Sequence, residues 1–181
     1  NTSGQNIITI IAHVDPNLVN PGSKDGELLV LKIPEDGNWL STDLAFFGKN
    51  TGTAGISHDM EAAAISIVPP QIQGDNPDFI LTATHRVGAS GNIGAECYLM
   101  KLNYDLVPLW DDARFFGNPN VANQWLSGNE AGRVLPLEEL VPGTTRKELT
   151  GYAFTGTFNL GTNSMIGLIK TNTIGTLTPE P

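Results

Sequence analysis

The chain of 181 residues suits a single domain, and its hydrophobic content of 40% is enough to bury a core. Ten Lys and Arg residues against nineteen Asp and Glu residues give a formal net charge of −9, which opposes binding to nucleic acid or to an anionic membrane. The single cysteine, Cys97, excludes an internal disulfide, and its apolar surroundings predict a small buried side chain rather than a nucleophile.

The predicted elements are short strands. Apolar runs recur between clusters of Gly, Pro, Asn and Asp, which is typical of an all-β chain. The best helical candidate, Leu135–Val141, is too short and too close to Pro136 and Pro142 to predict a helix. In chain order, the strand-length segments include Asn6–Val14, Glu61–Val68, Asp78–Arg86, Glu96–Leu102, Pro108–Phe116, Gly151–Gly161 and Ser164–Leu177.

A repeat with an interval of 69 residues runs through the chain. Gly26–Gly48 aligns with Ala95–Gly117 without a gap, and eight of the 23 aligned pairs are identical. A second shift of 69 places Lys170 under Lys101 and Lys32. These lysines are predicted at equivalent positions, with their stems on apolar surface and their amines near water or a carboxylate.

The strands that precede these segments repeat with a changed interval. Asp78–Gly88 resembles Gly151–Gly161 at a shift of 73, which predicts a loop four residues shorter in the last unit. Asn6–Pro16 is predicted as the first, degenerate copy, with His13 equivalent to His85. Because the two histidines would then hold one repeated position, an architectural role is favoured over a catalytic one.

The middle unit reads as four antiparallel strands and contains the motifs "DFILTATHRVG" and "AECYLMKLNYDL". The last unit contains "TGYAFTGTFNLGTNSMIGLIKTNTIG". These motifs, the last above all, resemble the blades of secreted and surface-attached bacterial β-propeller repeat proteins. The sequence departs from the usual pattern where Pro77-Asp78 replaces a Gly-Gly pair. The resemblance implies four-stranded antiparallel blade-like repeats that form part of a β-propeller. It also implies an extracellular, periplasmic or cell-surface location, and it implies no catalytic residue.

The predicted units, approximately 6–48, 59–117 and 131–177, form one all-β repeat domain of three, four and three strands. Propellers typically close with four to eight blades, so this set is too small to close a ring. Three explanations remain open: a longer polypeptide, copies that complete a ring as a homo-oligomer, or a β-sandwich. In each case we expect the strand edges of the first strand, Asn6–Val14, and of the last segment, Ser164–Leu177, to pair with another strand. The chain begins at Asn1, as expected after removal of an export segment or trimming.

Two groups of residues are candidates for ligand binding. Trp125 and Asn123 lie in the longest non-repeating insertion, 117–133, and irregular loops on a rigid scaffold often carry recognition. Trp110 and Asp111 are candidates for binding a sugar. An indole can stack on the face of a sugar ring, and a carboxylate can accept hydrogen bonds from sugar hydroxyl groups. In both groups a structural role remains the alternative.

No metal or cofactor is expected. His58-Asp59 with Glu61 lacks the spacing of an established zinc motif, and the acidic loops Asp15–Glu27 and Gln73–Asp78 lack the order of a calcium loop. The adjacency of Ser57, His58 and Asp59 does not amount to the geometry of a catalytic triad.

The expected function is a non-enzymatic extracellular binding or scaffolding module whose partner is a glycan or a protein. Two alternatives stay open. One is a glycan-cleaving propeller enzyme with Asp111, Asp112 and Glu61 as its carboxylates. The other is a structural subunit that self-assembles through sheet edges.

Overall fold

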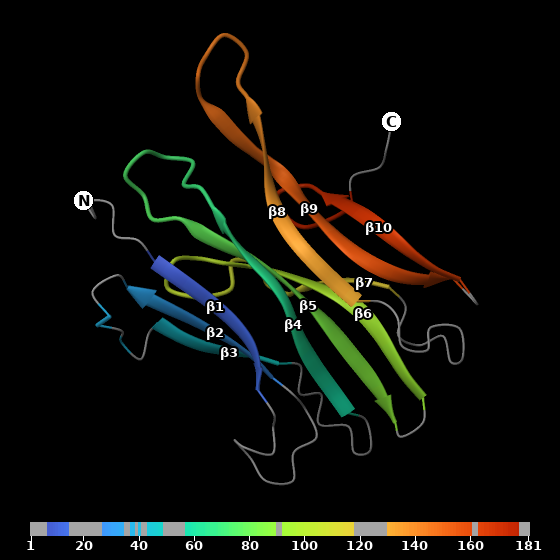
Figure 1. Cartoon of the computed structure of the whole chain (residues 1–181). Coiled ribbons are helices and arrows are strands. Elements are labelled where there is room, and N and C mark those ends of the chain that lie inside the picture. The colour runs from blue at the N-terminus through green and yellow to red at the C-terminus, as the bar shows by residue number, and fades with distance from the viewer. Residues whose placement is uncertain are drawn as a thin grey trace.

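The structure, a computed structural model, describes residues 7–14, 27–34, 37–38, 40, 43–48, 57–89, 92–117, 130–160 and 163–177. Across these ranges the regular elements are strands, and no α-helix is present. They form three antiparallel sheets that lie in a row, with the middle sheet packed between the other two (Figure 1). The all-β prediction is therefore confirmed, and the helical candidate at 135–141 lies mostly within a strand.

Each sheet is built from strands that are consecutive in the chain. The first sheet has the order β1 (Ile7–Val14), β2 (Glu27–Pro34), β3 (Leu44–Phe47). The middle sheet has the order β4 (Ser57–Val68), β5 (Asp78–Ala89), β6 (Asn92–Leu102), β7 (Arg114–Phe116). The third sheet contains β8 (Glu130–Leu140), β9 (Lys147–Leu160) and β10 (Asn163–Thr171), and its order is β10-β9-β8.

Backbone pairing repeats at the interval found in the sequence. Leu28 pairs with Phe47 in the first sheet, and Cys97 pairs with Phe116 in the middle sheet, 69 residues later on both strands. The turns after β2, β6 and β10 repeat as well. Their left-handed residues are Gly37, Leu106 and Gly175, with φ of 73°, 61° and 77°.

Leu106 is the exception in this series because it is not a glycine. A left-handed conformation costs a residue with a β-carbon roughly 1–2 kcal/mol. The side chain of Leu106 is almost fully buried in the core between the first and middle sheets. Burial of a leucine side chain contributes about 1.5–3 kcal/mol, which offsets that cost.

Two details of the predicted repeat are wrong. His13 pairs with Leu28, the equivalent of Cys97, whose own partner is Thr84. His13 is therefore the equivalent of Thr84 rather than of His85. Because successive residues of a strand point to opposite faces, this difference of one residue puts the two histidines on opposite faces of their sheets.

The second error concerns the last unit. The β5–β6 and β9–β10 hairpins both have two-residue connections, after the closing pairs Ala89–Asn92 and Leu160–Asn163. The four missing residues are therefore two residue pairs removed from the hairpin, and the loop itself is not shorter. In this way the ladder loses two residue pairs while the connection keeps its length.

The predicted strand Pro108–Phe116 is also shorter than expected. Only Arg114–Phe116 forms a strand, although Pro108 makes an isolated bridge to Leu102. Proline has no N–H for a ladder, and aspartate is depleted in strands. The segment that contains Pro108 and Asp111-Asp112 therefore starts beside the end of β6 and then bends.

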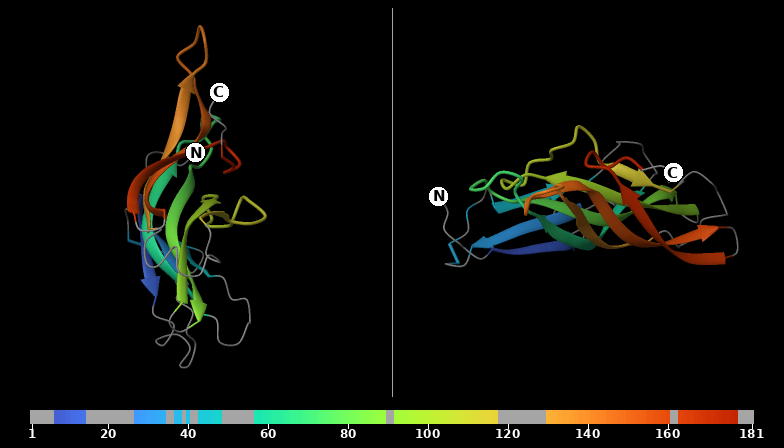
Figure 2. Two further views of the ribbon diagram at one scale, coloured as in Figure 1. Left: turned by 90° about the vertical axis from the view of Figure 1, so that its right-hand side faces the viewer. Right: turned by 90° about the horizontal axis from the view of Figure 1, so that it is seen from above.

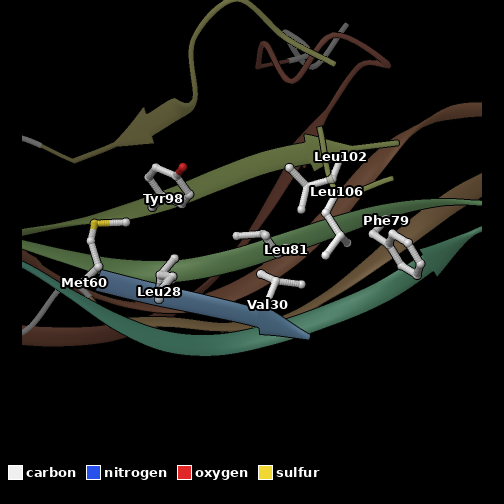
Figure 3. Packing of buried hydrophobic residues seen from close by; sticks show 9 residues of the cluster. Leu28, Val30, Met60, Phe79, Leu81, Tyr98, Leu102 and Leu106 are labelled. Carbon is white, nitrogen blue, oxygen red and sulfur yellow. The ribbon is translucent and has the colours of Figure 1, made fainter. Parts of the chain in front are cut away.

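Two hydrophobic cores hold the sheets together, one on each face of the middle sheet. Between the first and middle sheets, Leu28 and Val30 of β2 lie against Leu81 and Tyr98 (Figure 3). Between the middle and third sheets, a second core contains Val68, Ile80, Cys97, Leu99, Val134, Tyr152 and Phe154. This arrangement has one layer more than a two-layer β-sandwich, and the third sheet with its β8–β9 hairpin extends beyond the middle one (Figure 2).

Several polar contacts between sheets are made by residues on β1, β4, β5 and β8. Ser66 Oγ donates to the carbonyl of Val134 at 2.6 Å, and Thr82 Oγ1 donates to the carbonyl of Gly132 at 2.6 Å. His13 Nδ1 lies 2.7 Å from the carbonyl oxygen of Met60. The sheets do not close into a ring within the described ranges, and β1 and β10 each pair on one side only.

Candidate functional site

The candidate site is a pocket at the junction of the first and middle sheets, here called the Trp110 pocket. It has a volume of about 420 Å³. Its lining comes from the end of β3, from β6, from the bent segment after Pro108 and from β7. The lining residues are Gly48, Tyr98, Met100, Pro108, Trp110, Asp111, Asp112, Ala113 and Phe115.

Local hydrogen bonds shape the wall that carries the predicted ligand residues. Asn103 Oδ1 accepts from the backbone N–H of Val107 at 2.9 Å, and the N–H of Leu109 donates to the carbonyl of Lys101 at 2.9 Å. Arg114 Nη1 donates to the carbonyl of Asp112 at 2.9 Å. These contacts hold Trp110 and its neighbours against the end of the middle sheet.

The indole of Trp110 is partly buried and also contacts the third sheet. Its ring lies 5.9 Å from that of Tyr152 in an edge-on arrangement, and the guanidinium of Arg114 lies 5.4 Å from the Trp110 ring. A β-carbon at Gly175 would stand 2.6 Å from Trp110 Cη2. Trp110 therefore joins two sheets and lines the pocket at the same time.

Asp111 and Asp112 are exposed, and neither forms a salt bridge within the described ranges. The equivalent of Asp112 in the first unit is Asp43, which behaves differently. Asp43 accepts from the N–H of Leu40 at 2.8 Å and pairs with Lys32 at 3.0 Å, and these contacts lower the pKa of its carboxyl group despite partial desolvation. Among the described residues, Asp112 thus does not share the structural role of Asp43.

The other predicted site residues do not join the pocket. Trp125 and Asn123 lie outside the described residues. Glu61 on β4 binds Arg86 at 2.9 Å and is not among the residues that line the pocket. The carboxylates proposed for the glycan-cleaving alternative are therefore divided between the pocket and an ion pair.

Other titratable groups are held in structural contacts. Cys97 is fully buried, as predicted, and burial, aided by the charge of Glu96, raises the pKa of its thiol to about 12. His85 and Glu96 form a buried pair with 2.7 Å between Nδ1 and Oε1. Within the described ranges, no group of three His, Cys, Asp or Glu side chains is arranged to hold a metal ion.

A second, more open hollow lies where β1, β4 and β8 converge. It has a volume of about 610 Å³ and is lined by Thr9, Ile10, Ile11, Ala63, Ala64, Ile65, Ser66, Gly132 and Arg133. Most of these side chains are small or apolar, and Arg133 is the exception. This hollow offers few groups that would orient a ligand.

Sequence reasoning found Trp110, Asp111 and Asp112 but missed Tyr98, Met100 and Gly48. These three come to the pocket from β6 and from the end of β3, and no local pattern marks them. The repeat was the available signal for Gly48. It aligns Gly48 with Gly117, which ends the segment that contains Asp111 and Asp112.

No protein-family model, curated protein or solved structure matches the chain. No helix in the described ranges has the length and apolar character needed to cross a bilayer.

Proposed function

We propose that the chain is a non-enzymatic binding or scaffolding module of a protein that acts outside the cytoplasm, and that its ligand is a glycan held in the Trp110 pocket. The observation that carries the proposal is the lining of this pocket. Aromatic side chains meet there with two carboxylates that form no salt bridge to any described residue. Carboxylates accept hydrogen bonds from sugar hydroxyls, and aromatic rings cover the apolar faces of sugars.

We further propose that the three sheets are successive blades of a β-propeller arc. Support comes from the order of strands, from the 69-residue interval of pairing, and from the convergence of β1, β4 and β8. Propellers are built from four-stranded antiparallel sheets, and the middle sheet has four strands. The outside location follows from the resemblance to secreted repeat proteins and is part of the same proposal.

An array of oligosaccharides, followed by calorimetry with the best-bound sugar, tests the ligand. Replacement of Asp111 and Asp112 by Asn should weaken binding about tenfold, because each change replaces a charged acceptor by a neutral one. Glu139→Gln is the matched control, since Glu139 is an exposed carboxylate on β8 outside the pocket. Equal binding by the double variant and the parent would refute the assignment of this pocket.

The same samples separate binding from cleavage. A module without activity returns the bound oligosaccharide intact after long incubation. Release of new reducing ends that depends on Asp111 or Asp112 would instead support the glycan-cleaving alternative.

A further inference from the structure

Each sheet has two distinct faces, and the chain uses both faces of its middle sheet. The face toward the next sheet in the chain is called the downstream face, and the face toward the preceding sheet is called the upstream face. Both interfaces within the chain place a downstream face against an upstream face. This arrangement leaves one downstream face, on the third sheet, and one upstream face, on the first sheet.

The downstream face of the third sheet is apolar and exposed. Ile166 and Leu168 are 89% and 72% exposed. The repeat places them at the positions of Cys97 and Leu99, which are fully buried. Leu135, 48% exposed, extends the same patch onto β8.

The polar residues of this face show the same difference: they are exposed where their equivalents in the covered sheets are buried. Thr82 on the middle sheet is buried and donates to the carbonyl of Gly132 in the next sheet. Its equivalent, Thr155, is exposed. Lys32 is buried in the first interface, whereas its equivalent Lys170 is exposed.

The upstream face of the first sheet is exposed in the complementary way. Pairing makes Ile8 the equivalent of Phe79, and Ile10 the equivalent of Leu81. Phe79 and Leu81 are buried against the first sheet. Ile8 and Ile10 are 63% and 41% exposed.

We propose that the downstream face of the third sheet docks onto the upstream face of the first sheet in a second copy of this chain. The occupant is chosen by continuity with the existing interfaces, because both are formed by this pair of faces and by residues at the same repeat positions. The two exposed faces belong to the outer sheets of the row and do not meet within one molecule (Figure 1). Contact between unlike faces is heterologous, so it builds rings or filaments rather than an isologous dimer.

This proposal does not depend on a ligand in the Trp110 pocket. It also differs from pairing at strand edges, since it joins faces through side chains. Failure of glycan binding and failure of this association can therefore be told apart.

Sedimentation velocity of the whole chain over a concentration series tests the proposal. The parent should form species heavier than 19.3 kDa that increase with concentration. One double variant, Ile166→Glu with Leu168→Glu, places two charges on the downstream face. The other, Ile8→Glu with Ile10→Glu, places two charges on the upstream face. Each double variant should weaken association about 100-fold or more, because it places charges in an apolar contact.

The decisive sample is an equimolar mixture of the two double variants. Each still carries one intact face, so the mixture should form a one-to-one dimer with the affinity of a single interface. Ile72→Glu is the control, since Ile72 is an exposed residue of the β4–β5 turn in the middle unit, and it should associate like the parent.

Circular dichroism checks that the variants are folded, and Ile8→Glu alone replaces the upstream variant if that variant is unfolded. A parent that stays monomeric throughout the series overturns the proposal. That result would instead favour a further sheet of a longer polypeptide as the partner of these faces. Association of either double variant on its own with the affinity of the parent also overturns it, as does a mixture without dimer.

Discussion

Lys32 Nζ on β2 donates to the carbonyl oxygen of Tyr104 at 2.6 Å, across the interface between the first and middle sheets. The same amine lies 3.0 Å from Asp43 Oδ1 and 3.9 Å from the centre of the Tyr104 ring. A buried ammonium group is costly unless a counterion and further acceptors compensate it. Lys32 has all three partners, so this lysine contributes to the contact between the first and middle sheets.

Loss of the counterion should destabilise the chain. In Asp43→Asn, Lys32 keeps Tyr104 but loses its carboxylate, and removal of one partner of a buried pair typically costs about 3 kcal/mol. The free energy of unfolding in urea measures the effect. Lys170→Met, at the exposed equivalent position, should change this free energy by less than about 0.5 kcal/mol. An Asp43→Asn variant as stable as the parent would show that the pair does not stabilise the interface.

Asp43 also predicts a dependence on pH. Its pKa is lowered from the ordinary value of 3.8 in the folded state, first by the N–H of Leu40 and then by Lys32. A lowered folded-state pKa contributes stability that is present above the unfolded value and is lost as the pH falls through the folded value. As the pH falls below the ordinary value of 3.8, the parent should therefore lose more stability than Asp43→Asn. Parallel pH profiles for the two proteins would contradict this assignment.

Two glycines in equivalent turns should respond differently to a methyl group. Gly175 and Gly37 both have left-handed φ values, so alanine costs roughly 1 kcal/mol of backbone strain at either position. At Gly175 the new β-carbon also meets Trp110 and Arg114, whereas at Gly37 it meets nothing within 4 Å. Gly175→Ala should be less stable than Gly37→Ala by at least about 1 kcal/mol in urea unfolding. Equal losses would mean that Trp110 does not pack against this turn.

The thiol of Cys97 should be inert in the folded protein. The side chain is fully buried and its pKa is raised to about 12, so very little thiolate exists at neutral pH. Reaction with a disulfide reagent should be slow in buffer and complete in denaturant. Rapid labelling of the native protein would contradict the position of Cys97 in the core between the middle and third sheets.

The order of strands and their pairing were largely predictable from sequence, because alternating apolar runs and a repeat with an interval of 69 residues constrain both. The errors lie where local patterns compete with tertiary context. Residue identity aligns His13 with His85, although the ladder shifts His13 by one position. The apolar residues of Pro108–Phe116 predict a strand, although its proline and aspartates favour a bend.

Only one wall of the candidate site could be predicted from the sequence. Trp110 and Asp111 carry recognisable chemistry for sugars, and the structure places both in one pocket. The opposite wall, with Tyr98 and Gly48, depends on how the first sheet packs on the middle one. Packing between sheets is fixed by many long-range contacts, and no short motif encodes it.

We infer that the downstream face of each unit is built to be covered by the next unit. Leu99 and Leu168 hold the same position of this face in the middle and third sheets, and they are 0% and 72% exposed. The most direct measurement is the free energy of unfolding of Leu99→Ala and Leu168→Ala, made at a protein concentration where the chain is monomeric. Leu99→Ala should lose about 3–5 kcal/mol because it leaves a cavity, and Leu168→Ala should lose less than about 0.5 kcal/mol. Losses of equal size at the two positions would contradict the claim.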